Sequence, residues 1–466
     1  MEAMHSARNL PLCRKVLALL GLNIFVFVGN MFALGPATAF ADLAEEFGVR
    51  FSRLSDLITY PALLLGLANL LWVPTSLCIG KRPTTIISMI LFLAGGIWSY
   101  AVPTYDQLFA SRLVASFGAG SVESIGPSII ANMIEPRYYA TAMAFYALSL
   151  SGRSQIGPLI AGYITAARDW RWFFIICIIV IAVDLVLVFF LLPETLQDMN
   201  ALSTTGEFAP HSDSLEKGTE AIIENSEQVN FTPSARQELR SNGQTGRYWP
   251  NMLRLSISSC ARRDGILRYW FRTFLEPISI AWRPAVLYSS LTYGFILGSV
   301  ITVSTVSPQL FGAPPYLFSE IDLGLLSCAS PLTDIFAHFL DRRHGNVHHQ
   351  KHRLPALVVP FVICPPGIIC FGYSVARHAH YMIPAVRSAM LSSGLTLVPS
   401  ITMAYIAEIY GGSNGQAFVA INALKNIIGF GFSKGCYSWM NRMGVDRIFL
   451  TVAGIERGGT QTSSLH

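Results

Sequence analysis

The sequence predicts an all-α polytopic membrane protein, and three observations support this fold class. Hydrophobic residues make up 52% of the 466 residues and charged residues only 13%, whereas soluble domains carry about 25% charged residues. Successive apolar runs each approach the roughly 20 residues that cross a bilayer as a helix. The eight cysteines include no CxxC pair. Together these features exclude a soluble enzyme, a disordered protein, a coiled coil and a secreted disulfide scaffold.

The apolar runs form two sets separated by a hydrophilic stretch. Residues 1–195 are predicted to form an N-terminal half with six spans, at 16–40, 57–78, 84–102, 108–133, 140–166 and 172–192. Residues 283–466 are predicted to hold five full spans, at 284–306, 317–340, 354–376, 382–407 and 416–439. The only later apolar run, 448–455, makes about 12 Å of helix, which is too short to cross. We therefore expect a truncated or stunted twelfth segment.

Residues 196–282 are predicted to be a cytoplasmic linker that is disordered over most of its length. Its end differs, because between residues 262 and 280 arginines alternate with aromatic and aliphatic side chains at near-helical spacing. This pattern is typical of an amphipathic helix lying on an anionic leaflet. An ordinary solvated linker helix is the alternative.

The distribution of basic residues predicts the orientation in the membrane. Arg14 and Lys15 precede the first span, Lys81 and Arg82 follow the second, and the chain after the eighth span is also basic. Cytoplasmic loops carry the excess of Lys and Arg, so the N-terminus and the linker are expected to be cytoplasmic. The first run lacks a small-residue cleavage site, which indicates an uncleaved anchor.

Several short motifs lie in order on successive predicted spans. They are Leu54, Ser55, Asp56 and Leu57; Arg112 with Gly118, Ala119 and Gly120; Gly157 and Pro158 with Gly162; Trp170, Arg171, Trp172, Phe173 and Phe174; and Pro193, Glu194 and Thr195. In these residues the chain resembles the major facilitator superfamily, and within it the fungal drug:H+ antiporter-like group. The resemblance covers roughly residues 10–455 and implies two six-helix pseudo-repeats.

The motif residues have a structural interpretation. Small residues allow helix backbones to approach closely, and we expect this role for Gly118, Gly120, Gly157 and Gly162, with Pro158 bending the fifth helix. Asp56 is expected to open the second span as a motif residue. The chain departs from the family pattern near Gly80, Lys81 and Arg82, where Val73 and Leu77 replace a glycine and an acidic residue.

Arg112 and Glu123 are the candidate proton-coupling residues. They are separated by about 16 Å along a helix and by close to three turns, so both side chains are expected on one face. The resemblance links the position of Arg112 to proton coupling. Ionisable residues at membrane depth are functional candidates by default, and Glu123 is the candidate proton carrier. A structural carboxyl bonded to Ser121, Ser124 or a neighbouring helix is the alternative.

Arg153 stands where the family's antiporter motif has a glycine. An arginine midway along a span needs a cavity or a counter-charge, and Glu123 is the predicted partner. Three interpretations remain: a cation that selects an anionic substrate, a buried structural pair with Glu123, or a chain with impaired function.

Further polar residues within the spans are predicted to line a central substrate cavity. Asn23 and Asn30 share one face of the first span, and Asn422, Lys425 and Asn426 lie close together on the eleventh. Hydrogen bonding between helices is the alternative role.

These observations predict a secondary transporter of the major facilitator type, working as a monomer in the plasma membrane. The expected function is proton-coupled export of a small organic molecule such as a drug or secondary metabolite. Uptake of a cationic nutrient or polyamine, and a sensor or remnant without transport, are the alternatives. No phosphate-binding loop or catalytic constellation occurs, and the small net charge of +5 carries no nucleic-acid signature. We therefore expect no enzymatic activity, no cofactor, no metal and no nucleic acid.

Overall fold

The computed structural model describes residues 11–134, 136–194, 265–312, 316–319, 321–323 and 414–443, with several positions between 390 and 410. Each regular element in these residues is helical, which confirms the predicted all-α class. The spans predicted at 317–340, 354–376 and 382–407 fall mostly or wholly outside the described residues. The linker before residue 265 and the stunted segment at 448–455 also lie outside them.

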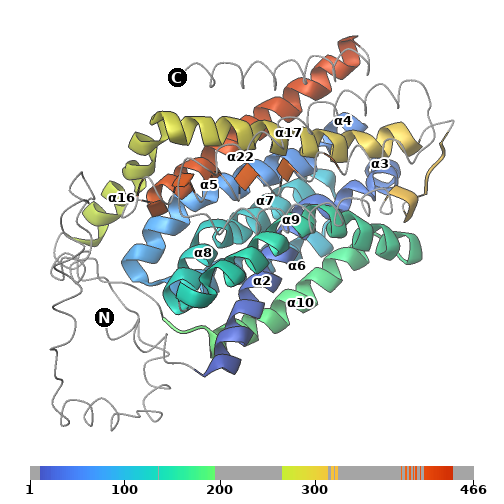
Figure 1. Ribbon diagram of the computed structural model, residues 1–466. Coiled ribbons are helices and arrows are strands. Elements are labelled where there is room, and N and C mark those ends of the chain that lie inside the picture. The colour runs from blue at the N-terminus through green and yellow to red at the C-terminus, as the bar shows by residue number, and fades with distance from the viewer. Residues whose placement is uncertain are drawn as a thin grey trace, which may run out of the picture.

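The long helices pack side by side into one bundle (Figure 1). The first part of the chain forms α2 (Leu12–Leu34), η1 (Gly35–Ala37), α3 (Phe40–Phe47), α4 (Phe51–Leu54), α5 (Asp56–Ile79), α6 (Lys81–Tyr100), α7 (Tyr105–Ala119), α8 (Val122–Met133), α9 (Pro136–Ala167) and α10 (Arg171–Leu191). The later part forms α16 (Ile266–Ala281), α17 (Pro284–Gly312) and α22 (Asn414–Met443).

Six segments of the described chain are long and apolar enough to cross a membrane. They are Leu12–Ala37, Phe51–Ile79, Lys81–Tyr100, Tyr105–Ile130, Arg171–Leu191 and Pro284–Gly312. These segments coincide with predicted spans one to four, six and seven. Helix α9 covers the predicted fifth span and α22 the eleventh.

Two predicted spans differ in detail from the helices that form them. The first was expected to run to residue 40, but α2 ends at Leu34 and a 3-10 turn with Pro36 follows. Proline has no N–H to continue the α-helical hydrogen bonds, which explains the early end. The fourth span is divided at Gly120 and Ser121 into α7 and α8.

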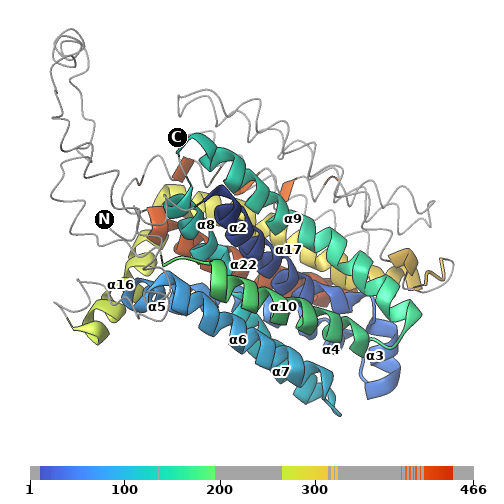
Figure 2. The same cartoon turned by 90° about the horizontal axis from the view of Figure 1, so that it is seen from below.

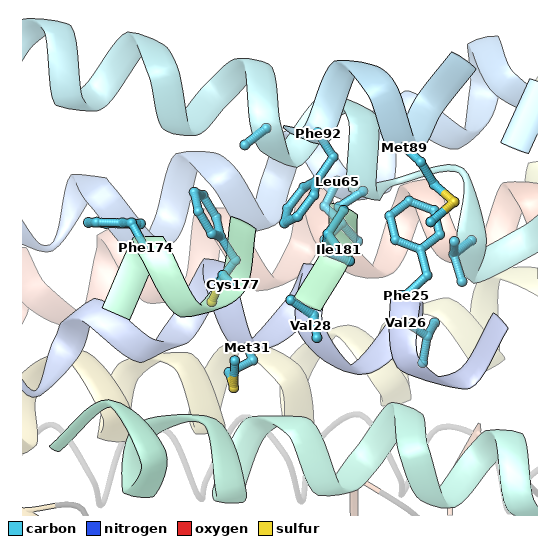
Figure 3. Close-up of a cluster of buried hydrophobic side chains, with 14 of the residues drawn as sticks. Phe25, Val26, Val28, Met31, Leu65, Met89, Phe92, Phe174, Cys177 and Ile181 are labelled. Carbon is cyan, nitrogen blue, oxygen red and sulfur yellow. The ribbon is translucent and has the colours of Figure 1, made fainter. Parts of the chain in front are cut away.

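The main apolar core lies among α2, α5, α6, α7 and α10. Figure 3 shows Phe25, Phe92 and Phe174 within it. The Phe32 ring lies 5.1 Å from that of Phe92 and 5.2 Å from that of Phe174, both in edge-on arrangements. Because lipid tails are as apolar as these side chains, close van der Waals packing stabilises the cluster within a membrane.

Helix α22 connects the early and late parts of the chain. It packs against α17 and also along α5, with a smaller contact to α8 (Figure 1). Helix α16 lies beside the end of α5 (Figure 2) and also contacts α22. The surfaces where α22 meets α5 and α8 therefore join the first set of spans to the second.

Candidate functional site

A buried ion pair joins α8 to α22. The Nζ atom of Lys425 lies 3.1 Å from Oε2 of Glu123, and the two side chains are only 2% and 3% exposed. Helix α17 contributes Tyr293, whose ring centre lies 4.5 Å from the Lys425 ammonium. Lys425 also donates a hydrogen bond of 3.4 Å to the Tyr293 hydroxyl oxygen. Three helices thus meet around one buried pair of opposite charges.

Because this pair is buried, its protonation state affects the stability of the contact between α8 and α22. Taking two charges out of water is costly, and their mutual attraction offsets that cost only while both remain charged. Removal of the Glu123 charge leaves the Lys425 ammonium as an uncompensated buried charge, at a cost of about 3–5 kcal/mol. A proton on Glu123 therefore weakens the contact between α8 and α22, because Lys425 loses its counter-charge there.

Next to the ion pair, the predicted polar face of α22 meets α8 and α5. Asn422 donates a 3.1 Å hydrogen bond to the Ser124 hydroxyl of α8. Asn426 donates to the carbonyl of Asn422 at 2.8 Å. A Cβ atom at Gly66 of α5 would lie 2.3 Å from the Asn426 amide nitrogen, so only glycine fits there. The structure thus brings Asn422, Lys425 and Asn426 together with Glu123.

On α2, the predicted polar pair is buried but bonds within its own helix. Asn23 donates to the carbonyl of Leu19 at 2.7 Å, and Asn30 donates to that of Val26 at 3.0 Å. The side-chain oxygen of Asn23 has no hydrogen-bond partner within the described part of the chain. Asn23 therefore keeps an acceptor for which a ligand could supply a donor.

Arg112 is fully buried and contacts α2. Its Nη2 atom donates to the carbonyl oxygens of Phe32 at 3.1 Å and Ala33 at 2.7 Å. Pro36 has no N–H with which to bond the Phe32 carbonyl, so the guanidinium supplies the missing donor. Arg112 thus holds the end of α2, whereas Glu123 contacts α22, and the two predicted coupling residues face different helices.

Three of the four predicted small residues lie at close contacts between helices. A Cβ atom at Gly118 would lie 2.5 Å from the Phe92 backbone nitrogen of α6, and one at Gly120 would lie 2.5 Å from the Leu65 carbonyl oxygen of α5. At Gly157 it would lie 3.0 Å from the Met31 side chain of α2. Pro158 lies inside α9, and the Gly162 carbonyl accepts a 3.2 Å hydrogen bond from Thr165.

A second ion pair joins α5 to α22, at the end of α5 that begins with Asp56. The Asp56 carboxylate pairs with the Lys434 ammonium, and both side chains are partly buried, at 25% and 33% exposure. Lys434 also lies 5.0 Å from the centre of the Tyr60 ring. The Tyr60 ring in turn lies 4.9 Å from that of Phe430. Asp56 therefore does more than open a helix, since it also contacts the last described helix.

The basic turn between α5 and α6 is organised by a carboxylate that follows α10. Glu194 accepts hydrogen bonds from the backbone N–H groups of Lys81 at 3.1 Å and Arg82 at 3.3 Å. These are orphan donors at a helix N-terminus, where a negative charge is stabilising. The Lys81 ammonium donates to the Ser128 carbonyl at 3.1 Å, and Arg82 donates to the Phe189 carbonyl at 2.5 Å.

Two residues of these contacts and the role of a third were not predicted from the sequence, and the predicted contact of Arg153 stays untested. Lys434, Tyr293 and the capping role of Glu194 were not predicted. A lysine within an apolar run was the available signal for Lys434, as it was for Lys425. The side chain of Arg153 lies outside the described residues, so its predicted pairing with Glu123 stays a prediction, and Lys425 is one partner that the structure gives to Glu123.

Comparison with known sequences shows the family of this chain. The family model described as Major Facilitator Superfamily matches residues 20–433. An uncharacterized MFS-type transporter of Schizosaccharomyces pombe is 21% identical, covering 94% of this chain and 81% of the relative. A probable efflux pump of Aspergillus flavus is also 21% identical, covering 84% of this chain and 86% of the pump.

Solved structures show the same fold at lower sequence identity. The chain superimposes on a partially occluded, inward-open xylose transporter of Escherichia coli with a TM-score of 0.64. The identity is 12%, and the match covers 95% of this chain and 96% of the xylose transporter. This likeness concerns the arrangement of helices alone.

Proposed function

Because the chain belongs to the Major Facilitator Superfamily, we propose that it is a proton-coupled carrier that exports a small amphipathic organic molecule by alternating access. One observation carries the proposal: the buried pair of Glu123 and Lys425, which joins α8 to α22. The efflux-pump name of the Aspergillus flavus relative supports export as the direction.

In this mechanism the proton binds to the Glu123 carboxylate. Protonation removes the negative charge that faces Lys425, and the contact between α8 and α22 weakens. The two sets of spans then favour the orientation in which they separate at this point. Loss of the proton restores the ion pair and returns the carrier to the orientation seen here.

Exchange of proton for substrate requires that the two exclude each other. A substrate with a hydrogen-bond donor or positive charge, placed beside Glu123, competes with the proton for the same carboxylate oxygens. Such a substrate also takes the place of Lys425, whose ammonium lies against the Tyr293 ring. Aromatic faces bind cations, so Tyr293 is suited to contact either the ammonium or the substrate.

The other predicted polar residues have supporting roles in the proposal. Asn422 and Asn426 hold α22 against α8 and α5, and we assign Asn23 and Asn30 to the substrate path along α2. Arg112 is a positioning residue that fixes the end of α2. Arg153 is assigned to the same path as a cation that sets substrate selectivity. The carrier acts as a monomer in the plasma membrane with its N-terminus in the cytoplasm.

The proposal is tested by efflux measurements in a yeast strain that lacks its own drug exporters. Cells that express the chain should accumulate less of at least one compound from a panel of fluorescent amphipathic molecules, and a protonophore should restore accumulation. Glu123→Gln should abolish the difference. Asp184→Asn is the matched control, because Asp184 is also a carboxyl buried within a span but lies on α10 near Gly21.

The remaining outcomes separate the alternatives. Accumulation that falls when the protonophore is added indicates uptake, and movement of no compound indicates a sensor or remnant. The double variant Glu123→Gln/Lys425→Gln guards against a folding defect, because it removes both charges together. Proton-dependent export that survives in a well-expressed Glu123→Gln variant contradicts the role of Glu123.

A further inference from the structure

Helix α16 has an apolar face that the described part of the protein does not cover. Leu267, Phe271, Leu275 and Ile278 are 76%, 58%, 56% and 45% exposed. Their spacing of four, four and three residues places them on one side of the helix. The opposite side packs on the bundle, where Thr273 and Pro277 are buried.

Two arginines lie beside this apolar face. Arg268 and Arg272 are exposed and one helical turn apart, and both line a groove of about 630 Å³. Among the described residues, the groove is also lined by Tyr269, Leu275, Glu276 and Ser279. Arg272 approaches Glu276 at 3.6 Å, but the arginine is 74% exposed, and such surface pairs contribute little. Both guanidinium groups are therefore available to an anion.

The position of α16 along the chain indicates what covers it. The helix ends at Ala281 and the membrane-spanning segment Pro284–Gly312 begins three residues later. Trp282, which lies between them, is 77% exposed, and tryptophan is enriched where a chain enters the headgroup region. An exposed apolar face directly before a membrane-spanning segment is suited to the surface of the bilayer.

We propose that Arg268 and Arg272 bind the phosphate of an anionic membrane lipid whose acyl chains cover the adjacent apolar face. Arginine pairs bind phosphate oxygens through charge-assisted hydrogen bonds. The four exposed apolar side chains distinguish a lipid from a free phosphate ion, which has nothing to place against them. The combination of basic and apolar faces is that of a helix lying in an anionic leaflet.

The site is connected to both sets of spans. Trp270 of α16 donates a 3.1 Å hydrogen bond to the Thr75 hydroxyl of α5. Gln416 of α22 donates a 3.2 Å hydrogen bond to the Glu276 carboxylate of α16. A lipid that holds α16 in place therefore also stabilises its contacts with α5 and α22, which lie at the opposite end of α5 from Asp56.

Lipid binding is measured by native mass spectrometry of the full-length protein, titrated with dioctanoyl phosphatidylserine or with dioctanoyl phosphatidylcholine. The wild-type protein should bind phosphatidylserine in preference. Arg268→Gln/Arg272→Gln should weaken that binding about 30-fold, because each arginine near a charged surface contributes about fivefold. Arg50→Gln/Arg53→Gln is the matched control, since it removes two exposed arginines at the other end of the bundle and should bind as the wild type does.

A second measurement needs no variant. A photoactivatable phosphatidylserine in phosphatidylcholine vesicles should crosslink to residues 266–283 of the wild-type protein, and inorganic phosphate should not reduce the crosslinking. Equal affinity in the wild type and Arg268→Gln/Arg272→Gln, crosslinks that avoid this segment, or competition by inorganic phosphate would each overturn the proposal.

Discussion

Asp56, the first residue of α5, forms an ion pair with Lys434 of α22. The same two helices are joined at the other end of α5 by α16, which bonds Thr75 of α5 and Gln416 of α22. The contact between α5 and α22 is therefore held at both of its ends. Movement of one set of spans relative to the other requires at least one of these connections to break.

Removal of the Asp56 charge should loosen the nearer end of this contact. In a Phe430→Cys background without other reactive cysteines, Asp56→Asn should raise the rate of labelling by a membrane-impermeant maleimide about fivefold. This corresponds to roughly 1 kcal/mol, as expected for a partly exposed ion pair. Asp106→Asn is the control, because Asp106 forms a more exposed pair with Arg53 at 3.7 Å. Equal labelling in the two variants would contradict the role of Asp56.

The buried pair of Glu123 and Lys425 should show strong energetic coupling. Glu123→Gln or Lys425→Gln alone should destabilise the protein by about 3 kcal/mol, because each breaks the buried contact between the two opposite charges. The double variant should recover most of that loss. Thermal unfolding in detergent measures the effect, with the exposed Glu45→Gln as control. Additive losses in the double variant would mean that the two charges do not depend on each other.

The turn between α5 and α6 should tolerate no side chain at Gly80. Its φ of 107° disfavours any other residue, and a Cβ atom would lie 2.5 Å from Oε2 of Glu194. Gly80→Ala should therefore destabilise more than Gly48→Ala, where φ is 62° and no atom lies within 4 Å. For the strained backbone at Gly80→Ala alone we expect a loss of about 1–3 kcal/mol in the free energy of unfolding.

Glu194 supplies an independent check on that turn. Glu194→Ala removes the cap of α6 and should cost about 1 kcal/mol. In combination with Gly80→Ala it should cost less than the sum of the two single variants, because the colliding carboxylate is gone. Strictly additive losses in thermal unfolding would place the cost of Gly80→Ala in the backbone conformation alone.

Arg112 should be needed because Pro36 leaves a carbonyl without a donor. Arg112→Gln should cost about 1.5–3 kcal/mol, the range for hydrogen bonds that involve a charged group. In a Pro36→Ala background the cost should be smaller, because the backbone regains an N–H for the Phe32 carbonyl. If Arg112→Gln costs the same in both backgrounds, Arg112 does not act by supplying the donor that Pro36 lacks.

The features that could be predicted from the sequence are those that depend on residues close together in the chain. Helices α5 and α10 were predicted within a few residues, because hydropathy is a local property. Pro36, which follows the early end of α2 at Leu34, was also a local signal, but the long apolar run that surrounds it concealed the break. Local patterns thus located the spans in the part of the chain that the structure describes.

The pairing of charges was beyond sequence reasoning. Glu123 and Lys425 were each selected as buried polar residues, but not as partners, since Arg153 on the next span was the nearer candidate. Lys434 lies 378 residues from Asp56 in sequence and was not selected. Such pairs depend on which helices become neighbours, and a single sequence contains no record of that.

The central claim is that Glu123 carries the coupled proton, and transport in proteoliposomes tests it most directly. With a compound found by the efflux screen, Glu123→Gln should still exchange labelled for unlabelled compound at equilibrium but should not accumulate it when a pH gradient is applied. Wild-type protein and Asp184→Asn should do both. Accumulation driven by the pH gradient at the wild-type level in Glu123→Gln would contradict the account.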